Sequence, residues 1–260
     1  MRTFERPLAL GELLAETIRL YGERIWSALG IGGLMAGSLV AAVSLGGLGA
    51  IAIFTCALTA CAAAAARVVA GDSFAEAWAQ VASRGPVLLV LAVIVWLPVV
   101  LMVTGVFLIG LLPAALWLGF LGFAVPAAAV ELPPGRVGPS GVAIALGRAA
   151  ALARAAYLHA VGIAAALLLL NLLLDVVLGG ALVSFADNSR LAADALAQVV
   201  LGPLVLLGLS VLFFEQRVRA LSSPRQGQTP RGRRDADVPD AVHAERAGDA
   251  DAPRQSRADS

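Results

Sequence analysis

The sequence predicts an all-α membrane protein, a polytopic bundle of about six transmembrane helices with three interfacial amphipathic helices on the cytoplasmic side. Three observations predict this fold. The chain is 59% hydrophobic and only 14% charged, whereas a soluble domain is about 25% charged. Its apolar residues form runs near the ~20 residues that a bilayer core requires. Its arginines fall almost entirely on one side when these runs are taken as membrane spans.

Six apolar runs are long enough to cross a bilayer. The Gly46-Gly47-Leu48-Gly49 stretch suits a tight turn between the first two, and a polar link around Asp187–Asp194 separates the last two. The first run follows a charged amphipathic segment rather than a short basic one, so we interpret it as an uncleaved anchor. The expected spans cover residues 25–44, 48–68, 86–109, 113–130, 157–183 and 195–214.

An amphipathic segment precedes each pair of spans, at residues 8–24, 73–84 and 139–154. Such segments are too charged to cross a membrane and are expected to lie at its surface. The resulting unit, one amphipathic helix and a two-span hairpin, recurs about every 65 residues. Duplication can produce such units, but their residue identities are poor, so shared membrane constraints are the favoured cause.

The arginines set the expected orientation, because cytoplasmic loops of bacterial membrane proteins are enriched in Lys and Arg. With both termini in the cytoplasm, only Arg190 lies outside. We therefore expect a multi-pass protein of the bacterial cytoplasmic membrane. The arginines on the inner side, without the tail, are Arg2, Arg6, Arg19, Arg24, Arg67, Arg84, Arg136, Arg148, Arg154, Arg217 and Arg219.

The chain divides into an integral membrane domain, residues 1–221, and a cytoplasmic tail, residues 222–260. The tail mixes Arg, Asp, Pro, Ser and Gln without apolar periodicity, so it is expected to be disordered. The formal net charge is only +1, which argues against nucleic acid as a partner.

Asn171 and Asp175 are the candidate intramembrane polar residues. Both lie within the fifth span, one helical turn apart on the same face, where they can share a hydrogen bond. An ionisable group in hydrocarbon costs about 2.5–3.5 kcal/mol on insertion scales. One interpretation is a substrate, ion or proton site. The favoured alternative is a structural contact between helices, or an Asp175 that reaches the outer interface.

Other ionisable residues are expected to have structural roles. Glu131 follows the fourth span and is a candidate ion-pair partner of Arg148 or Arg154 on the next cytoplasmic helix. Glu215 has the same interpretation with Arg217 and Arg219. His159 lies about 24 Å along the helix from Asp175 and cannot form a catalytic dyad with it.

No catalytic, cofactor or metal motif is present in the sequence. It has no Gly-x-Ser-x-Gly elbow, P-loop or His/Cys cluster, so we expect no enzyme activity, no cofactor and no metal. Cys56 and Cys61 are five residues apart on one helix, where they project away from each other. Gly33 and Gly37 have the spacing that permits close helix approach, within the chain or between chains.

Three stretches resemble a bacterial family, the multi-pass membrane domain attached to some glycerophosphoryl diester phosphodiesterases and its stand-alone relatives. They are the opening Leu10–Leu14, the central Pro126–Glu131 with Ala145–Arg154, and the closing Phe213–Arg219. The resemblance implies a membrane domain over residues 8–220. In that family the phosphodiesterase chemistry resides in a separate soluble domain, so the resemblance does not imply this activity here.

Two functional hypotheses follow from this pattern. The first is a non-enzymatic membrane scaffold that binds a membrane or cytoplasmic protein partner through its amphipathic helices, with lipids around its spans. The alternative is a transporter or lipid-handling protein with an inter-helix cavity near Asn171 and Asp175. A closed bundle favours the scaffold, and a cavity that reaches these residues favours transport.

Overall fold

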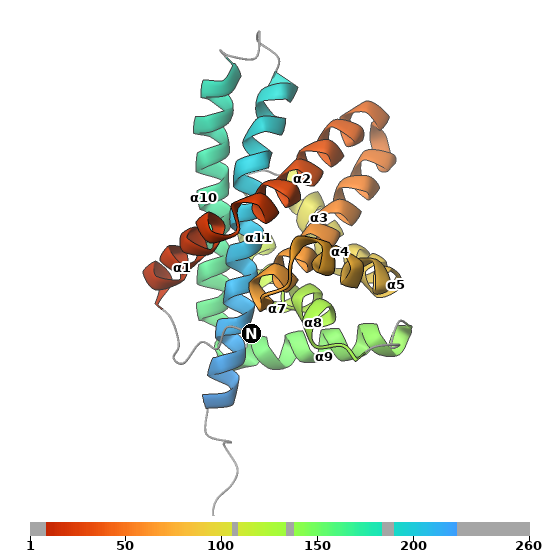
Figure 1. Cartoon of the computed structure of the whole chain (residues 1–260), viewed down its shortest axis with the longest axis vertical. Helices are drawn as coiled ribbons and strands as arrows, with labels where there is room; N and C mark the ends of the chain where they lie inside the picture. The colour runs from red at the N-terminus through yellow and green to blue at the C-terminus, as the bar shows by residue number, and fades with distance from the viewer. Residues whose placement is uncertain (1–8, 106–108, 134–137, 184–189, 223–260) are drawn as a thin grey trace, which may run out of the picture. The chain divides into compact units, whose positions relative to one another are not determined.

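The structure is a computed structural model that describes residues 9–105, 109–133, 138–183 and 190–222. Within these ranges the protein is all-α, without a strand, as the sequence predicts (Figure 1). The first unit consists of a short amphipathic helix, α1 (Leu10–Glu23), and a hairpin of two long helices, α2 (Ile25–Leu45) and α3 (Gly47–Ala70). Gly46 and Gly47 both have positive φ and form the tight turn between the two long helices.

The second unit repeats this order but both of its spans are interrupted. It begins with α4 (Phe74–Ser83), whose N-terminus is capped by Ser73. The third span consists of α5 (Gly85–Leu91), the π-helical segment η1 (Ala92–Trp96) and α6 (Leu97–Gly105). The fourth consists of α7 (Leu111–Leu121) and α8 (Ala124–Val130).

Two prolines explain these interruptions. Pro98 has no N–H, and a proline ring clashes with the carbonyl four residues earlier in a regular α-helix. The chain widens before it, so that the Leu97 N–H donates to the carbonyl of Ala92, five residues back. The indole N–H of Trp117 donates to the Val95 carbonyl at 3.1 Å, which satisfies part of the widened segment. Pro126 has the same relation to the break between α7 and α8. It lies no more than four residues after that break, within the reach of its ring.

The third unit comprises α9 (Pro139–Ala155), α10 (Tyr157–Val183) and α11 (Arg190–Ser222). The expected start of the last span at residue 195 is wrong, because α11 begins five residues earlier. Arg190 and Asp194 form an i, i+4 ion pair at 3.9 Å, so these polar residues extend the helix instead of forming a link. Six helices of the described chain are long and apolar enough to cross a membrane, which confirms the predicted helix bundle.

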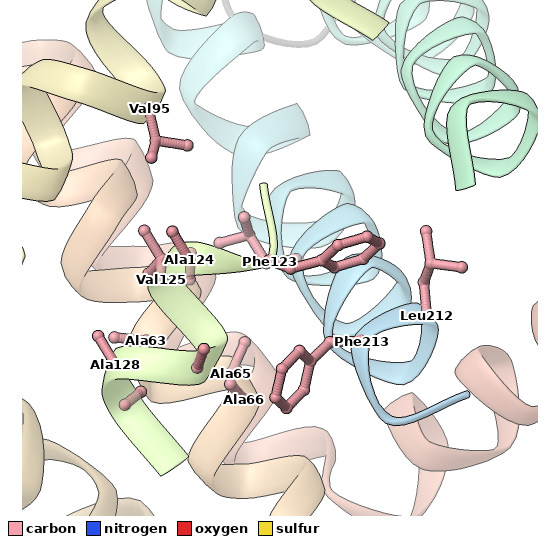
Figure 2. Close-up of a cluster of buried hydrophobic side chains, with 14 of the residues drawn as sticks. Ala63, Ala65, Ala66, Val95, Phe123, Ala124, Val125, Ala128, Leu212 and Phe213 are labelled. Atoms are coloured by element: carbon pink, nitrogen blue, oxygen red, sulfur yellow. The ribbon is translucent and has the colours of Figure 1, made fainter. Parts of the chain in front are cut away.

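Helix α11 lies at the centre of the packing. It packs most extensively against α2 and α10 and also contacts α1, α3 and α9. Small residues permit close contact elsewhere, since Figure 2 shows the fully buried Ala63, Ala65 and Ala66 of α3 beside α8, which carries the buried Ala124 and Ala128. The side chain of Phe213 extends from α11 into this cluster.

The close helix approach in α2 occurs at a glycine other than the expected pair. Gly33 and Gly37 are exposed, and no described atom lies within 4 Å of a Cβ built on either. Instead, a Cβ on Gly32 would lie 2.0 Å from the Val199 carbonyl oxygen of α11. Gly33 and Gly37 are therefore at no helix contact within the described chain, and the buried face of α2 is the one that carries Gly32.

The described helices lie between Leu10 and Ser222, so α11 extends one residue beyond the predicted end of the membrane domain at residue 221. The tail predicted to be disordered lies, from residue 223 onward, outside the described residues.

Candidate functional site

The described bundle has two regions with polar side chains inside it. The first is a layer of paired charges at one end. We name it the arginine layer. It lies where the spans meet the amphipathic helices α1, α4 and α9, and it consists of Arg24, Arg67, Asp72, Arg84, Glu131, Arg148, His159, Glu215, Arg217 and Arg219.

Arg24 and Arg84 have equivalent roles in the first two units. Each immediately precedes the first span of its hairpin, and each donates to carbonyls at the end of the second span of the same hairpin. Arg24 donates to the carbonyl of Asp72 at 3.0 Å. Arg84 donates to the carbonyls of Ala129 and Leu132, the latter at 3.0 Å. The last carbonyls of a helix lack intrahelical partners, so each guanidinium caps a helix end and closes its hairpin.

The equivalent roles of Arg24 and Arg84 favour an origin of the first two units by duplication, which their poor residue identities do not. The two arginines are 48 residues from the carbonyls of Asp72 and Leu132, respectively. In the third unit His159, near the start of α10, instead lies 3.1 Å from a guanidinium nitrogen of Arg219, near the end of α11.

Glu131 joins three helices. Its carboxylate pairs with Arg148 of α9 at 2.7 Å and with Arg217 of α11 at 3.4 Å. The predicted pair with Arg148 is therefore present. The alternative partner Arg154 is exposed on α9, and no ion pair joins it to Glu131 in the described chain. The prediction that Arg217 pairs with Glu215 is wrong, because Arg217 extends to Glu131.

Glu215 and Gln216 are fully buried polar residues near the end of α11. Glu215 forms an ion pair with Arg219, accepts a hydrogen bond from the Gln216 amide at 3.2 Å, and lies 3.7 Å from His159. A buried carboxylate requires such partners, since an unpaired charge removed from water is very costly. The arrangement fixes α11 against α10 and gives these residues a structural role.

Arg84 is a half-buried cation of the layer. Burial lowers its pKa from the ordinary value of an arginine, and the neighbouring Arg67 lowers the pKa further, while Asp72 opposes both effects. Asp72 is already paired with Arg67 at 2.6 Å. The Arg84 guanidinium is thus held mainly by backbone carbonyls.

The second polar region is a cavity of about 200 Å³ in the middle of the spans, which we name the mid-span cavity. It lies among helices from all three hairpins, and its described lining carries no charged side chain. The residues that line it are Met35, Phe54, Leu58, Trp96, Val99, Val100, Val103, Leu118, Leu168, Asn171, Gln198, Gly202, Val205, Leu206 and Leu209.

Three lining residues carry polar groups. Asn171 is at the middle of the 27-residue α10, and Gln198 is in the first half of α11. Both side chains are half-buried, and no hydrogen bond of either is found within the described chain. Trp96 is only 4% exposed, and its indole N–H has no acceptor among the described residues. Within the described chain, the two amides that line the cavity therefore have no hydrogen-bond partner, and the indole N–H of Trp96 has no accessible surface.

Of the predicted pair of Asn171 and Asp175, the structure describes the side chain of Asn171 only. Asn171 lines the cavity, as the alternative functional hypothesis requires, whereas the side chain of Asp175 lies outside the described residues. Gln198 and Trp96 were missed by sequence reasoning. An amide inside an apolar run was an available signal for Gln198, but nothing in the sequence indicates which helix faces converge on it.

Comparisons with known proteins add no family or relative. No family model matches the sequence, and the searches of curated proteins and of solved structures find no match. Within the described residues, no group of three or more His, Cys, Asp or Glu side chains is placed to hold a metal ion.

Proposed function

We propose that this chain is a lipid-handling or transport protein of the bacterial cytoplasmic membrane that binds a lipid-soluble molecule in its mid-span cavity. One observation carries the proposal. A cavity of about 200 Å³ lies between the hairpins and is lined by the amide side chains of Asn171 and Gln198. A cavity near Asn171 is the feature that distinguishes this hypothesis from a closed scaffold.

Asn171 and Gln198 place amide groups inside membrane spans. Polar side chains in membrane spans are costly unless they find a partner or face a cavity, where they mark pathways and binding sites. An amide moved from water to an apolar environment without a hydrogen bond costs roughly 1–3 kcal/mol by protein mutational data, which is an upper bound for these half-buried side chains. A bound molecule that pairs with them recovers this cost, and the surrounding apolar side chains favour a molecule that is itself mostly apolar.

The proposed orientation places both termini in the cytoplasm. The arginine layer gathers the cations of α3, α9 and α11 at one end of the spans, whereas Arg190 begins α11 at the opposite end. Cytoplasmic segments are enriched in arginine. The layer therefore faces the cytoplasm in this proposal, and membership of the phosphodiesterase-associated membrane-domain family, without enzyme activity, remains part of it.

A membrane scaffold is the second candidate function. The observation that favours it is the attachment of α9 to α8 and α11 through Glu131, Arg148 and Arg217. This attachment presents the outer face of an amphipathic helix in a fixed position. A cytoplasmic or membrane protein partner would bind there in this alternative.

The test compares two Val→Phe variants of the third span. Val99 is buried and lines the cavity, whereas Val93 is 57% exposed on the outside of the same span. Lipids and small molecules that copurify with the full chain in mild detergent are identified by mass spectrometry. We expect Val99→Phe to lose a component that the wild type and Val93→Phe retain. An identical set of bound molecules in all three proteins would contradict the proposal.

A further inference from the structure

We infer that the mid-span cavity binds an uncharged carbonyl group carried on a long hydrocarbon chain, with the carbonyl accepting hydrogen bonds from the amides of Asn171 and Gln198. This inference rests on the proposed function and specifies the chemistry of its ligand. It depends on three properties of the cavity, namely its charge, its polar groups and its size.

The charge of the lining excludes an anionic headgroup. No described lining residue is an arginine or a histidine. Arg217 and Arg219, which pair with Glu131 and Glu215, are near the end of α11, some 20 residues beyond Gln198, which is about 30 Å along the helix. A phosphate or carboxylate at this depth would remain uncompensated, and a charge removed from water without a partner is very costly.

The amides of the lining can pair with an acceptor in the ligand. Asn171 and Gln198 each provide two N–H donors and one acceptor oxygen, and the indole of Trp96 provides a donor only. The indole N–H has no accessible surface and no acceptor in the described chain, so its pairing requires a rotation of the ring. Each amide oxygen also accepts two hydrogen bonds, so the donors and acceptors of the two amides are equal in number. A carbonyl oxygen, which accepts two hydrogen bonds and donates none, can accept one from the NH2 group of each amide.

The size and the rim of the cavity define the remainder of the ligand. A dry protein cavity of 150 Å³ accommodates benzene, so about 200 Å³ accommodates one ring or a short acyl segment but not a whole lipid. Phe54 and Val103 of the lining are only half-buried, which leaves the cavity connected to the outside of the bundle. A longer hydrocarbon tail would extend there into the bilayer.

Two kinds of membrane molecule present this chemistry, the ring carbonyl of a prenylated quinone and the ester carbonyl of a diacylglycerol. Binding to the full chain in nanodiscs is measured for decylbenzoquinone and dioctanoylglycerol. Two matched controls are decylbenzene, which lacks the carbonyl, and dioctanoyl phosphatidic acid, which adds a phosphate to the glycerol ester.

The expected result is that one of the two carbonyl compounds binds at least tenfold more tightly than decylbenzene and than phosphatidic acid. The double variant Asn171→Leu/Gln198→Leu is expected to lose about tenfold of this affinity, the effect of two neutral hydrogen bonds, without a change for decylbenzene. The carbonyl compound that binds identifies the source.

Failure of the inference is distinguishable from failure of the proposed function. If decylbenzene binds as well as the carbonyl compounds, and Val99→Phe abolishes its binding, the cavity is a binding site but the inferred chemistry is wrong. Tighter binding of phosphatidic acid would overturn the inference as well. If no compound binds and Val99→Phe retains every copurifying molecule, both are overturned.

Discussion

The arginine layer and the mid-span cavity are formed by the same helices, but they differ in whether their polar groups have partners within the described chain. In the layer, Glu131 and Glu215 each have at least two partners. In the cavity, the amides of Asn171 and Gln198 have none in the described chain. The carboxylates of the layer are thus paired with cations of the chain itself. The two amides have no such partner among the described residues and are therefore the better candidates for ligand binding.

The largest effect on stability is expected from Arg219→Ala. This change leaves the fully buried Glu215 without its ion-pair partner, and removal of one partner of a buried pair costs about 3–5 kcal/mol. Unfolding in detergent by heat or by SDS titration measures the loss. The control is Arg190→Ala, since that side chain is 88% exposed and 3.9 Å from Asp194. Equal stability of Arg219→Ala and Arg190→Ala would contradict the structural role of the arginine layer.

Arg84→Ala is expected to destabilise the second hairpin by about 2 kcal/mol, because hydrogen bonds from charged donors contribute about 1.5–3 kcal/mol. The guanidinium donates to two carbonyls at the end of α8. Arg154→Ala, on an exposed side chain of α9, serves as the control and should be near neutral. Both variants are measured by the same unfolding transition. A loss of stability in Arg154→Ala but not in Arg84→Ala would contradict the role of Arg84 in closing the second hairpin.

Gly32→Ala and Gly33→Ala test the contact between α2 and α11. A Cβ at position 32 would overlap the Val199 carbonyl, so we expect a loss of about 1–3 kcal/mol from overpacking. A Cβ at position 33 meets no described atom. That substitution should leave stability within about 0.5 kcal/mol or increase it, because alanine has the higher helix propensity. A larger loss of stability for Gly33→Ala than for Gly32→Ala would contradict the packing of the Gly32 face of α2 against α11.

The smallest effect is expected from the capping box of α4. Ser73→Ala removes a side chain that accepts from the Glu76 N–H at 3.4 Å, and such caps contribute roughly 1 kcal/mol. Ala75→Ser, which leaves the cap intact, is a control at a neighbouring exposed position. Circular dichroism during thermal unfolding measures both variants.

The same capping box predicts a pH dependence. Hydrogen bonds from the backbone and side chain of Ser73 lower the pKa of Glu76 from its ordinary 4.5. The stabilisation is therefore complete above pH 4.5 and is lost as the pH falls through the lower pKa of the folded state. Glu76→Gln keeps a capping side chain but should remove this acid-side loss. The described lining of the cavity has no ionisable group, so ligand binding should stay constant over the same range.

The fold was predictable from the sequence to a larger extent than the cavity. The length of an apolar run depends on the solvent around the segment, so the six long apolar helices and the amphipathic helices that precede each pair were predicted, although α11 begins five residues earlier than expected. Their interruptions were not, because the effect of Pro98 depends on how η1 widens and where Trp117 lies. Gln198, Trp96 and Asn171 come from three helices, and only tertiary packing determines that they share one cavity.

The guanidinium groups of Arg24 and Arg84 have a consequence for biogenesis. Each reaches backbone that is synthesised fewer than fifty residues later, so the first two hairpins can each close with residues of their own while translation continues. The inner face of α2 must wait longer, because its most extensive partner is α11, the last helix to emerge. Nascent chains that stop before Arg190 would thus hold two closed hairpins whose mutual arrangement still lacks its central helix.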